Sequence, residues 1–451
     1  MSTGLVWFRA DLRLGDNPAW NAATSDHEKV VALFVVDPRL WGTAGEHRRS
    51  QLAAHLGALD RSLQARGGRL RVRRGDPQRV VPAEAAAVQR VHWNEDAAPY
   101  ARRRDAAVRQ ALGGRAEGHG GRFVHAPGTV STAAGGPFKV FTPFFRAWQA
   151  RPWDLWPEPG GAAVAADTGE GIPEAGPPLM APGEEAAAER HEAFLDRVER
   201  YSEERDRPDL DTTSRLSADL KFGVLSPRTV VRRVAGPGDG RAAFLRQMAW
   251  RDFYAHLLAA FPATRRQAMR PEYDVVAWRI DPEGFAAWAG GRTGYPFVDA
   301  AMRQLRAEGF VPNRARMVAA SFLVKDLLID WRLGERHFFH WLVDGDPAQN
   351  AGNWQWVAGT GADAAPYFRV FNPVAQGIRF DPDGAYVRRW VPELSRLAAP
   401  AIHAPWEAAP AVLAAAGVTL GVTYPAPLVN HAEARLEVLA AYRAARRPRP
   451  A

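Results

Sequence analysis

Apolar and polar positions follow two different periodic patterns along this chain. In the first part, short apolar runs rich in Val, Leu, Phe and Trp occupy residues 5–8, 30–36, 69–73, 90–93 and 122–124. Stretches with helical periodicity lie between them, at residues 45–66, 77–89 and 97–112. Strands that alternate with helices in this way predict a parallel sheet with helices on both faces. We therefore expect a Rossmann-like α/β domain over residues 1–127.

The second pattern begins after a stretch without periodicity. Residues 151–183 are dense in Pro, Gly, Ala and acidic side chains, which predicts a long surface linker within an interdomain segment, 128–185. Beyond it the strand pattern fades, and helical periodicity recurs at residues 186–201, 227–234, 242–260, 296–308, 313–330 and 335–342. We expect the larger C-terminal domain, 186–451, to be all-α.

The composition narrows the class of protein. With 451 residues, of which 47% are hydrophobic and 24% charged, the chain predicts a soluble globular protein of more than one domain. It has no cysteine, which excludes disulfides, thiolate metal sites, iron–sulfur clusters and a cysteine nucleophile. Charged residues interrupt the first twenty positions and no apolar run is long enough to cross a bilayer, so we expect a cytoplasmic protein. The net charge of +8 favours a polyanionic partner only weakly. Most of the basic residues are arginine, and an excess of arginine is also a product of genome composition.

A polar segment interrupts the helical half. Residues 344–356 contain two aspartates, several amides and two tryptophans. Buried Asp, Asn and Gln side chains need hydrogen-bond partners, so this density predicts a large polar ligand. Residues two apart on a helix project about 200° from each other. Trp354 and Trp356 therefore cannot line one pocket side by side, and the same arithmetic separates Asp344 from Asp346.

Three other segments carry candidate chemistry, each with an ordinary structural alternative. Residues 213–217 place three hydroxyls and Arg215 before a helix, which suits a diphosphate, although helix capping explains the segment better when it is taken alone. Asn313 and Met317 share a helix face that suits a flat, partly polar ring, whereas core packing explains Met317 by itself. The third segment places four residues on one polar–aromatic stripe of a helix, namely Gln247, Trp250, Arg251 and Tyr254. Such a stripe can line a cavity or belong to an ordinary amphipathic helix.

Together and in this order, these segments resemble the DNA photolyase/cryptochrome family, most closely the bacterial class I cyclobutane pyrimidine dimer photolyases. The resemblance covers nearly the whole chain, through residues 6–14 (VWFRADLRL), 213–217 (TSRLS), 250–254 (WRDFY), 293–296 (TGYP), 313–317 (NRARM), 354–356 (WQW) and 371–373 (FNP). It implies an α/β domain followed by a helical FAD-binding domain. It also implies a monomeric lyase that uses light to repair UV-damaged DNA, with no metal site.

By this resemblance, reduced FAD is the catalytic cofactor. Its phosphates would be held by Tyr201, Thr213, Ser214, Arg215, Leu216 and Ser217. The other cofactor-binding residues would be Phe244, Arg251, Arg316, Asp344, Gly345, Asp346 and Asn350, with Asn350 at the reactive edge of the flavin. The resemblance also implies a chain of tryptophans that carries electrons from the surface to the flavin, formed by Trp278, Trp331 and Trp354.

The resemblance assigns the DNA side of the site as well. The flipped-out dimer would enter a cavity formed by Gln247, Trp250, Asn313, Met317 and Trp356, with Arg251 nearby. Aromatic walls suit this task because stacking tolerates either pyrimidine. Positions near the DNA backbone, where arginine matches phosphate geometry, correspond to Arg205, Arg314, Arg369 and Gln376.

Two residues depart from the family pattern. Gln247 stands where cyclobutane-type enzymes commonly carry Glu, although an amide can still donate a hydrogen bond to a thymine carbonyl. Gln also occurs there in enzymes for the (6-4) photoproduct, but those carry His where this chain has Asn313 and Met317. We therefore expect a cyclobutane dimer as substrate, with the (6-4) photoproduct as the alternative. Gly15 replaces a usual His, with no consequence that the sequence suggests.

Two further predictions concern the light-harvesting cofactor and an alternative function as a photoreceptor. Folate-binding relatives carry a His and an Asn-Glu pair where this chain has Ala44 and residues 100–101, which argues against methenyltetrahydrofolate. Arg48 and Asp96 resemble the pocket of deazaflavin-binding relatives, so we expect 8-hydroxy-5-deazaflavin. A cryptochrome photoreceptor is the alternative from another class of function. It usually carries a long signalling tail, whereas this chain ends soon after its last family-like helix.

Overall fold

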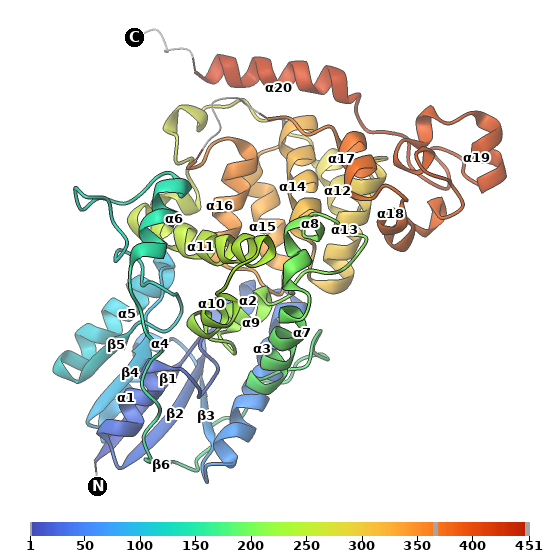
Figure 1. Ribbon diagram of the computed structural model, residues 1–451. Helices are drawn as coiled ribbons and strands as arrows, with labels where there is room; N and C mark the ends of the chain where they lie inside the picture. Colours follow the sequence, from blue (N-terminus) through green and yellow to red (C-terminus); the bar gives the residue numbers. More distant parts are fainter. Residues whose placement is uncertain (1, 364–368, 447–451) are drawn as a thin grey trace. The chain divides into compact units, whose positions relative to one another are not determined.

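The computed structural model describes residues 2–363 and 369–446 (Figure 1). Its first part forms a parallel sheet of β1 (Thr3–Phe8), β2 (Lys29–Val36), β3 (Leu70–Arg74), β4 (Arg90–Asn94), β5 (Ala116–His119) and β6 (Ala163–Val164). The order is β3-β2-β1-β4-β5, and β6 pairs with β2. The predicted α/β class is confirmed. The central strand β1 is buried on both faces, which explains its unbroken apolar run.

Helices cover both faces of the sheet. On one face, Leu5, Trp7 and Trp93 pack with side chains of α4 (Pro77–Glu84) and α5 (Pro99–Leu112). Because successive side chains of a strand alternate between faces, His92 and Asn94 point to the other side, where α1 (Pro18–Asp26) packs against β4. The remaining helices here are α2 (Pro38–Thr43) and α3 (Glu46–Gln64).

One predicted strand is wrong. Residues 122–124 form no strand, and the fifth strand is instead β5, a few residues earlier. This edge strand pairs only with β4 and carries Glu and His, so it lacks the apolar run that a buried strand shows. Phe123 is buried for another reason, because it packs with Ala97 and Ala255 in a small apolar cluster.

The rest of the chain is helical, as predicted. The described residues from 184 onward contain helices and turns but no named strand. The helices are α6 (Phe141–Ala150), α7 (Glu184–Leu195), α8 (Tyr201–Glu204), α9 (Ser217–Phe222), α10 (Pro227–Val234), α11 (Asp239–Ala260), α12 (Pro282–Ala289), α13 (Pro296–Glu308), α14 (Asn313–Ser321), α15 (Trp331–Trp341), α16 (Pro347–Ala358), α17 (Pro373–Phe380), α18 (Ala385–Trp390), α19 (Pro410–Ala416) and α20 (His431–Ala445). Helix α14 passes into a π-helical turn, η6 (Phe322–Asp326), so the predicted helix over 313–330 is regular only in its first half.

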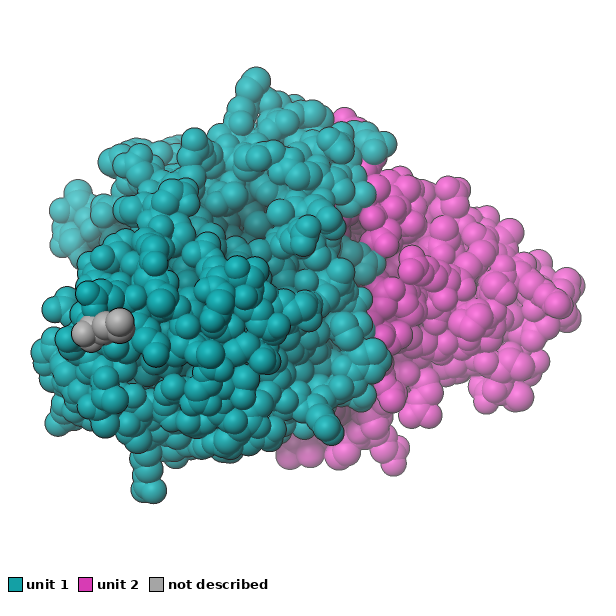
Figure 2. Space-filling view, turned by 90° about the horizontal axis from the view of Figure 1, so that it is seen from below, with its two compact units in different colours: residues 1–202, 214–262, 340–349 teal, residues 203–213, 263–339, 350–451 magenta. Residues whose placement is uncertain are grey.

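The chain divides into two compact units whose segments interleave along the sequence (Figure 2). Unit 1 consists of residues 1–202, 214–262 and 340–349, and unit 2 of residues 203–213, 263–339 and 350–451. The predicted domain boundaries at residues 127 and 185 stay a prediction. Within the described ranges, every helix is too short or too polar to span a bilayer.

Candidate functional site

Helix α11 carries the predicted polar–aromatic stripe of unit 1. Its residues Gln247, Trp250 and Arg251 are half-buried, whereas their neighbours Met248 and Ala249 are fully buried. The Trp250 ring stacks on Phe141 of α6, with centroids 3.8 Å apart and planes 5° apart. Arg251 donates from Nη1 to the Arg122 carbonyl at 2.7 Å and from Nη2 to the Leu220 carbonyl at 3.1 Å. Trp250 is therefore fixed by ring stacking and Arg251 by two hydrogen bonds, while Tyr254, the last residue of the stripe, is buried.

The predicted phosphate-binding segment begins α9, as expected. Ser217 is the first residue of that helix, and the Ser214 hydroxyl accepts a hydrogen bond from the Leu216 amide at 3.4 Å. Arg215 has a φ of +52°, a left-handed conformation that is uncommon for a residue with a side chain and is concentrated at functional sites. Tyr201 packs edge-on against Phe244, with ring centroids 5.3 Å apart.

Thr212, which was not predicted as a site residue from the sequence, belongs to the same run of hydroxyls. Its Oγ1 is buried and has no hydrogen-bond partner among the described residues. A buried hydroxyl without a partner costs free energy unless a ligand supplies one, and a phosphate oxygen can accept from it. The signal was visible in the sequence, because Thr212 directly precedes the run 213–217.

Asp344 and Asp346 do not lie on a helix, so the 200° arithmetic applied to them is wrong. Both belong to the turn between α15 and α16, because Pro347 starts a new helix. The Asp346 Oδ1 accepts hydrogen bonds from the amides of Ala348 at 2.9 Å and Gln349 at 3.2 Å, which caps α16. Its other oxygen lies 3.6 Å from Nη2 of Arg122. Asp346 thus fixes the start of α16, and the turn with Gly345 leads into that helix.

Asn350 is held by a buried carboxylate in unit 2. Its Nδ2 donates to the Glu335 backbone carbonyl at 2.8 Å and to the Glu335 Oε1 at 2.7 Å. Glu335 is only 2% exposed, and its Oε1 also pairs with Nη1 of Arg265. Because the amide nitrogen is engaged twice, the orientation of the Asn350 side chain is fixed. Neither Glu335 nor Arg265 was predicted as a site residue from the sequence, because a Glu among the Arg and His residues of an amphipathic helix gives no distinct signal.

The predicted opposition of Trp354 and Trp356 is confirmed. Both lie on α16, where Trp354 is 3% exposed and Trp356 is half-buried. Trp354 packs edge-on against Phe338, with centroids 5.1 Å apart, and against Trp288 at 6.2 Å. A Cβ on Gly334 would lie 2.2 Å from the Trp354 ring, so only glycine at that position lets the indole reach α15.

The other two predicted electron carriers differ in burial. Trp331 is 1% exposed, and its indole nitrogen has no hydrogen-bond partner among the described residues. Trp278 is half-buried beside Tyr442, with ring centroids 6.0 Å apart. Trp278 is thus the most exposed of the three tryptophans, as expected for the surface end of an electron path, whereas Trp331 and Trp354 are both buried.

The predicted DNA-side residues of unit 2 fall into one pair and several single positions. Asn313 donates from Nδ2 to the Met317 sulfur at 3.3 Å, so these two do share one face of α14. Arg314 is engaged with Asp206 at 2.8 Å. On the same helix, Arg316, which was predicted to bind the cofactor and not the DNA, donates from Nε to the Val311 carbonyl. The remaining positions are half-buried or exposed, namely Arg205, Arg369 and Gln376.

Asp96 borders a cavity of about 430 Å³ in unit 1, lined also by Phe123, Arg228 and His256. Its Oδ1 accepts from the Ala98 amide at 3.1 Å, and its Oδ2 pairs with Arg122. Burial raises the pKa of Asp96, but the guanidinium groups of Arg122 and Arg9 outweigh this and hold the pKa below its usual range.

Arg48, the other predicted antenna residue, is not among the residues that line this cavity. It is buried on α3 and donates from Nη1 to the Leu342 carbonyl at 3.1 Å. Burial lowers the pKa of Arg48 to about 10, and the carboxylate of Asp344 opposes that shift. The structure thus places Arg48 beside the turn that carries Asp344.

Comparisons with known proteins agree with these observations. Residues 4–160 match the family model described as DNA photolyase, and residues 244–444 match the FAD binding domain of DNA photolyase. The deoxyribodipyrimidine photo-lyase of Agrobacterium fabrum is 40% identical over 98% of both chains. A bacterial class III photolyase from Agrobacterium tumefaciens superposes with a TM-score of 0.92 at 39% identity, over 99% of this chain and 98% of that one. The archaeal photolyase from Sulfolobus tokodaii, solved with two FAD molecules, gives a TM-score of 0.87 at 32% identity, over 98% and 100%.

A parallel α/β sheet followed by a helical part that matches an FAD-binding domain defines a flavin-dependent protein. The chain belongs to the DNA photolyase family, and FAD is its cofactor. The buried hydroxyl of Thr212 and the fixed amide of Asn350 are polar groups of the kind that such a cofactor requires. The assignment to class I stays a prediction.

Proposed function

We propose that this photolyase repairs cyclobutane pyrimidine dimers in DNA. The observation that carries the choice of substrate is the Asn313–Met317 pair on one face of α14, where enzymes for the (6-4) photoproduct carry histidine. An amide and a thioether offer a weakly polar surface for a pyrimidine. Unlike a histidine, neither group has an acidic proton that it can transfer near neutral pH.

The proposed roles of the residues follow from how each is held. When bound, FAD supplies the excited electron that splits the cyclobutane ring. Asn350 presents its amide in a fixed orientation, because Glu335 holds the nitrogen. Trp250, stacked on Phe141, forms a rigid aromatic wall for a flipped base. Thr212 and the hydroxyls of residues 213–217 bind the phosphates.

A repair assay tests this function directly. The purified enzyme is incubated with one oligonucleotide that contains a cyclobutane dimer and another that contains a (6-4) photoproduct, in blue light and in darkness. We expect loss of the cyclobutane lesion in light only. Repair of the (6-4) lesion alone would reverse the assignment of substrate, and repair of neither would favour a photoreceptor.

Gln247 is the residue whose substitution should improve the enzyme. It lies half-buried on α11, one turn from Trp250. A carboxylate there can accept a hydrogen bond from a thymine N–H more strongly than an amide, because bonds to charged groups contribute about 1.5–3 kcal/mol instead of about 1. We expect Gln247→Glu to raise the affinity for dimer-containing DNA or the yield of repair, measured by filter binding and by the light assay. A large loss of both would show that Gln247 does not face the dimer.

We further propose that the antenna is 8-hydroxy-5-deazaflavin and that it binds in the cavity beside Asp96. A volume of about 430 Å³ lies within the range typical of small-molecule sites. The absorption spectrum of enzyme from a host that makes deazaflavin tests this, and we expect a deazaflavin band beside the flavin bands. A folate-like band, a second flavin or no additional band would contradict the proposal. Substitution of Asp96 by Ala is expected to remove the antenna band and leave FAD content unchanged.

A further inference from the structure

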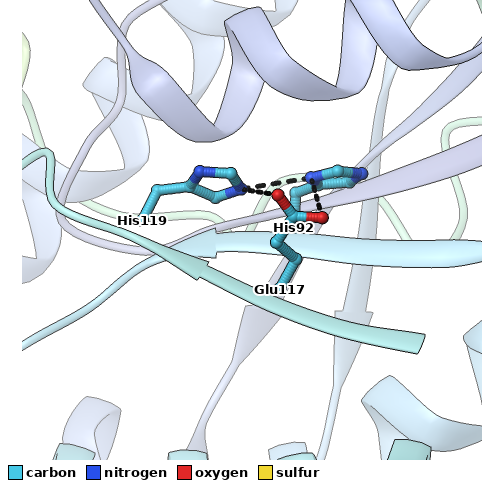
Figure 3. Close-up of side chains that lie close together, drawn as sticks. All are labelled: His92, Glu117 and His119. Carbon is cyan, nitrogen blue, oxygen red and sulfur yellow. Dashed lines mark hydrogen bonds and ion pairs between the residues drawn. The ribbon is translucent and has the colours of Figure 1, made fainter. Parts of the chain in front are cut away.

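Three side chains converge at the edge of the sheet, apart from the predicted flavin and dimer residues (Figure 3). His92 on β4 is in register with Glu117 on β5, and His119 follows Glu117 by two residues, so all three point to the same face. The His92 Nδ1 lies 3.1 Å from the His119 Nε2. The two carboxylate oxygens of Glu117 lie 3.9 Å from the His92 Nδ1 and 3.7 Å from the His119 Nε2.

We propose that His92, Glu117 and His119 bind a zinc ion. Tetrahedral zinc binds nitrogen at about 2.0–2.1 Å and carboxylate oxygen at about 2.0–2.2 Å, so its ligand atoms lie about 3.3–3.5 Å apart. Two observed separations, 3.1 Å between the imidazole nitrogens and 3.7 Å between the His119 Nε2 and the Glu117 Oε1, lie near that value. With one atom from each residue, all three ligand atoms lie within 4.8 Å of one another, so side-chain rotations suffice to bring them onto one ion. Two imidazoles and one carboxylate are a donor set that zinc commonly uses, with water in the fourth position.

Both histidines are prepared to act as neutral ligands. His92 is fully buried and His119 is half-buried. Metal binding requires the unprotonated imidazole, and burial favours the neutral form of each ring.

The surroundings orient the three ligands. The His92 Nε2 lies 3.4 Å from the His27 Nε2, so a His92 that binds metal through Nδ1 can donate a hydrogen bond from its Nε2–H to His27. A Cβ on Gly4 would lie 2.3 Å from the His27 ring, so glycine on β1 makes room for that ring. Arg90 donates to the Glu117 Oε2 at 2.7 Å and thereby leaves Oε1 for the metal.

The position of the cluster suggests what the ion does. The edge strand β5 is short and pairs only with β4. A zinc ion bound by one residue of β4 and two of β5 would cross-link the two strands and oppose their separation. A ligand that binds only the folded state stabilises it by mass action. A metal site was not predicted from the sequence; its three ligands come from two strands and follow no local motif.

The test uses the flavin-loaded enzyme, stripped of metal with a chelator and then dialysed free of it. Zinc chloride is added, and bound zinc is measured by equilibrium dialysis and elemental analysis. We expect one zinc per chain and a higher unfolding temperature. Cobalt chloride provides a second readout, since tetrahedral cobalt gives visible absorption bands that octahedral aqueous cobalt lacks.

Two variants locate the site. We expect His119→Gln and Glu117→Gln each to weaken zinc binding by at least about tenfold. Zinc should then no longer raise the unfolding temperature, whereas His191→Gln, outside the cluster, should bind like the parent. His119→Asp, which restores a ligand, should recover part of the affinity and shows whether a loss reflects misfolding. No stoichiometric zinc in the parent enzyme, or equal affinity in parent and both variants, would mean that the cluster is a hydrogen-bonded histidine pair only.

Discussion

Replacement of Trp331 by Phe is expected to abolish most of the light-driven reduction of the bound flavin while repair by chemically reduced enzyme continues. The residue is 1% exposed, and its indole nitrogen has no hydrogen-bond partner among the described residues, so a phenyl ring leaves no polar group unsatisfied. The cost in stability should stay well below the roughly 3–5 kcal/mol typical of Trp→Ala. A phenyl ring is much harder to oxidise than an indole, so the electron path is interrupted.

The measurement is the rate at which oxidised flavin bleaches under blue light with an external electron donor. Repair is then assayed after reduction with dithionite. Trp20→Phe is the matched control, because Trp20 is also fully buried and its indole nitrogen also lacks a partner among the described residues. The control should photoreduce at the parent rate.

An unchanged rate in Trp331→Phe would remove Trp331 from the electron path. The structure then offers a different candidate, because Trp288 packs edge-on against the Trp354 ring with centroids 6.2 Å apart. Trp288 was not predicted from the sequence, and its indole nitrogen donates to the Ala319 carbonyl at 2.9 Å. Loss of photoreduction in Trp288→Phe alone would redirect the path through it.

Features set by local chemistry could be predicted from the sequence. Helix α13 is correct at both ends, because Pro296 supplies a preset φ at its start and Gly309 accepts a φ of +58° at its end. The opposite orientation of Trp354 and Trp356 followed from helix geometry alone. The edge strand β5 could not be predicted, since its Glu, Gly and His residues lack the apolar pattern on which strand prediction depends.

The candidate functional site could likewise be predicted from the sequence only in part. Asn350 and the hydroxyls of residues 213–217 are recognised by residue type and order along the chain. What fixes Asn350 is a carboxylate on another helix, and the cation that pairs with that carboxylate lies 70 positions away from it in the sequence. No periodicity relates such residues. Positioning contacts that join distant segments are therefore visible only in the folded chain.

The second substitution with a large expected effect is Glu335→Ala, which should lower stability. We expect Glu335→Ala to lower the free energy of unfolding by about 3 kcal/mol, near the low end of the range for breaking a buried ion pair, because Arg265 is left without its carboxylate but keeps a quarter of its surface in water. Urea unfolding measures this change. Glu393→Ala is the matched control, since its pair with Arg303 is more exposed on the acidic side, and we expect a loss of about 1 kcal/mol or less.

The same substitution should alter the flavin through Asn350. Without the Glu335 carboxylate, the Asn350 nitrogen loses one of its two hydrogen bonds and keeps the one to the backbone carbonyl at 2.8 Å, so the orientation of the amide is less firmly held. We expect the chemically reduced flavin to reoxidise faster in air and the yield of dimer repair to fall, with neither change in Glu393→Ala.

A double variant separates the two roles of Glu335. In Glu335→Ala combined with Arg265→Ala, Arg265 no longer leaves an unpaired charge, so part of the lost stability should return. The flavin should still reoxidise quickly, because Asn350 has not regained its acceptor. If the double variant restores slow reoxidation together with stability, Glu335 acts on the fold alone and the orientation of Asn350 has another cause.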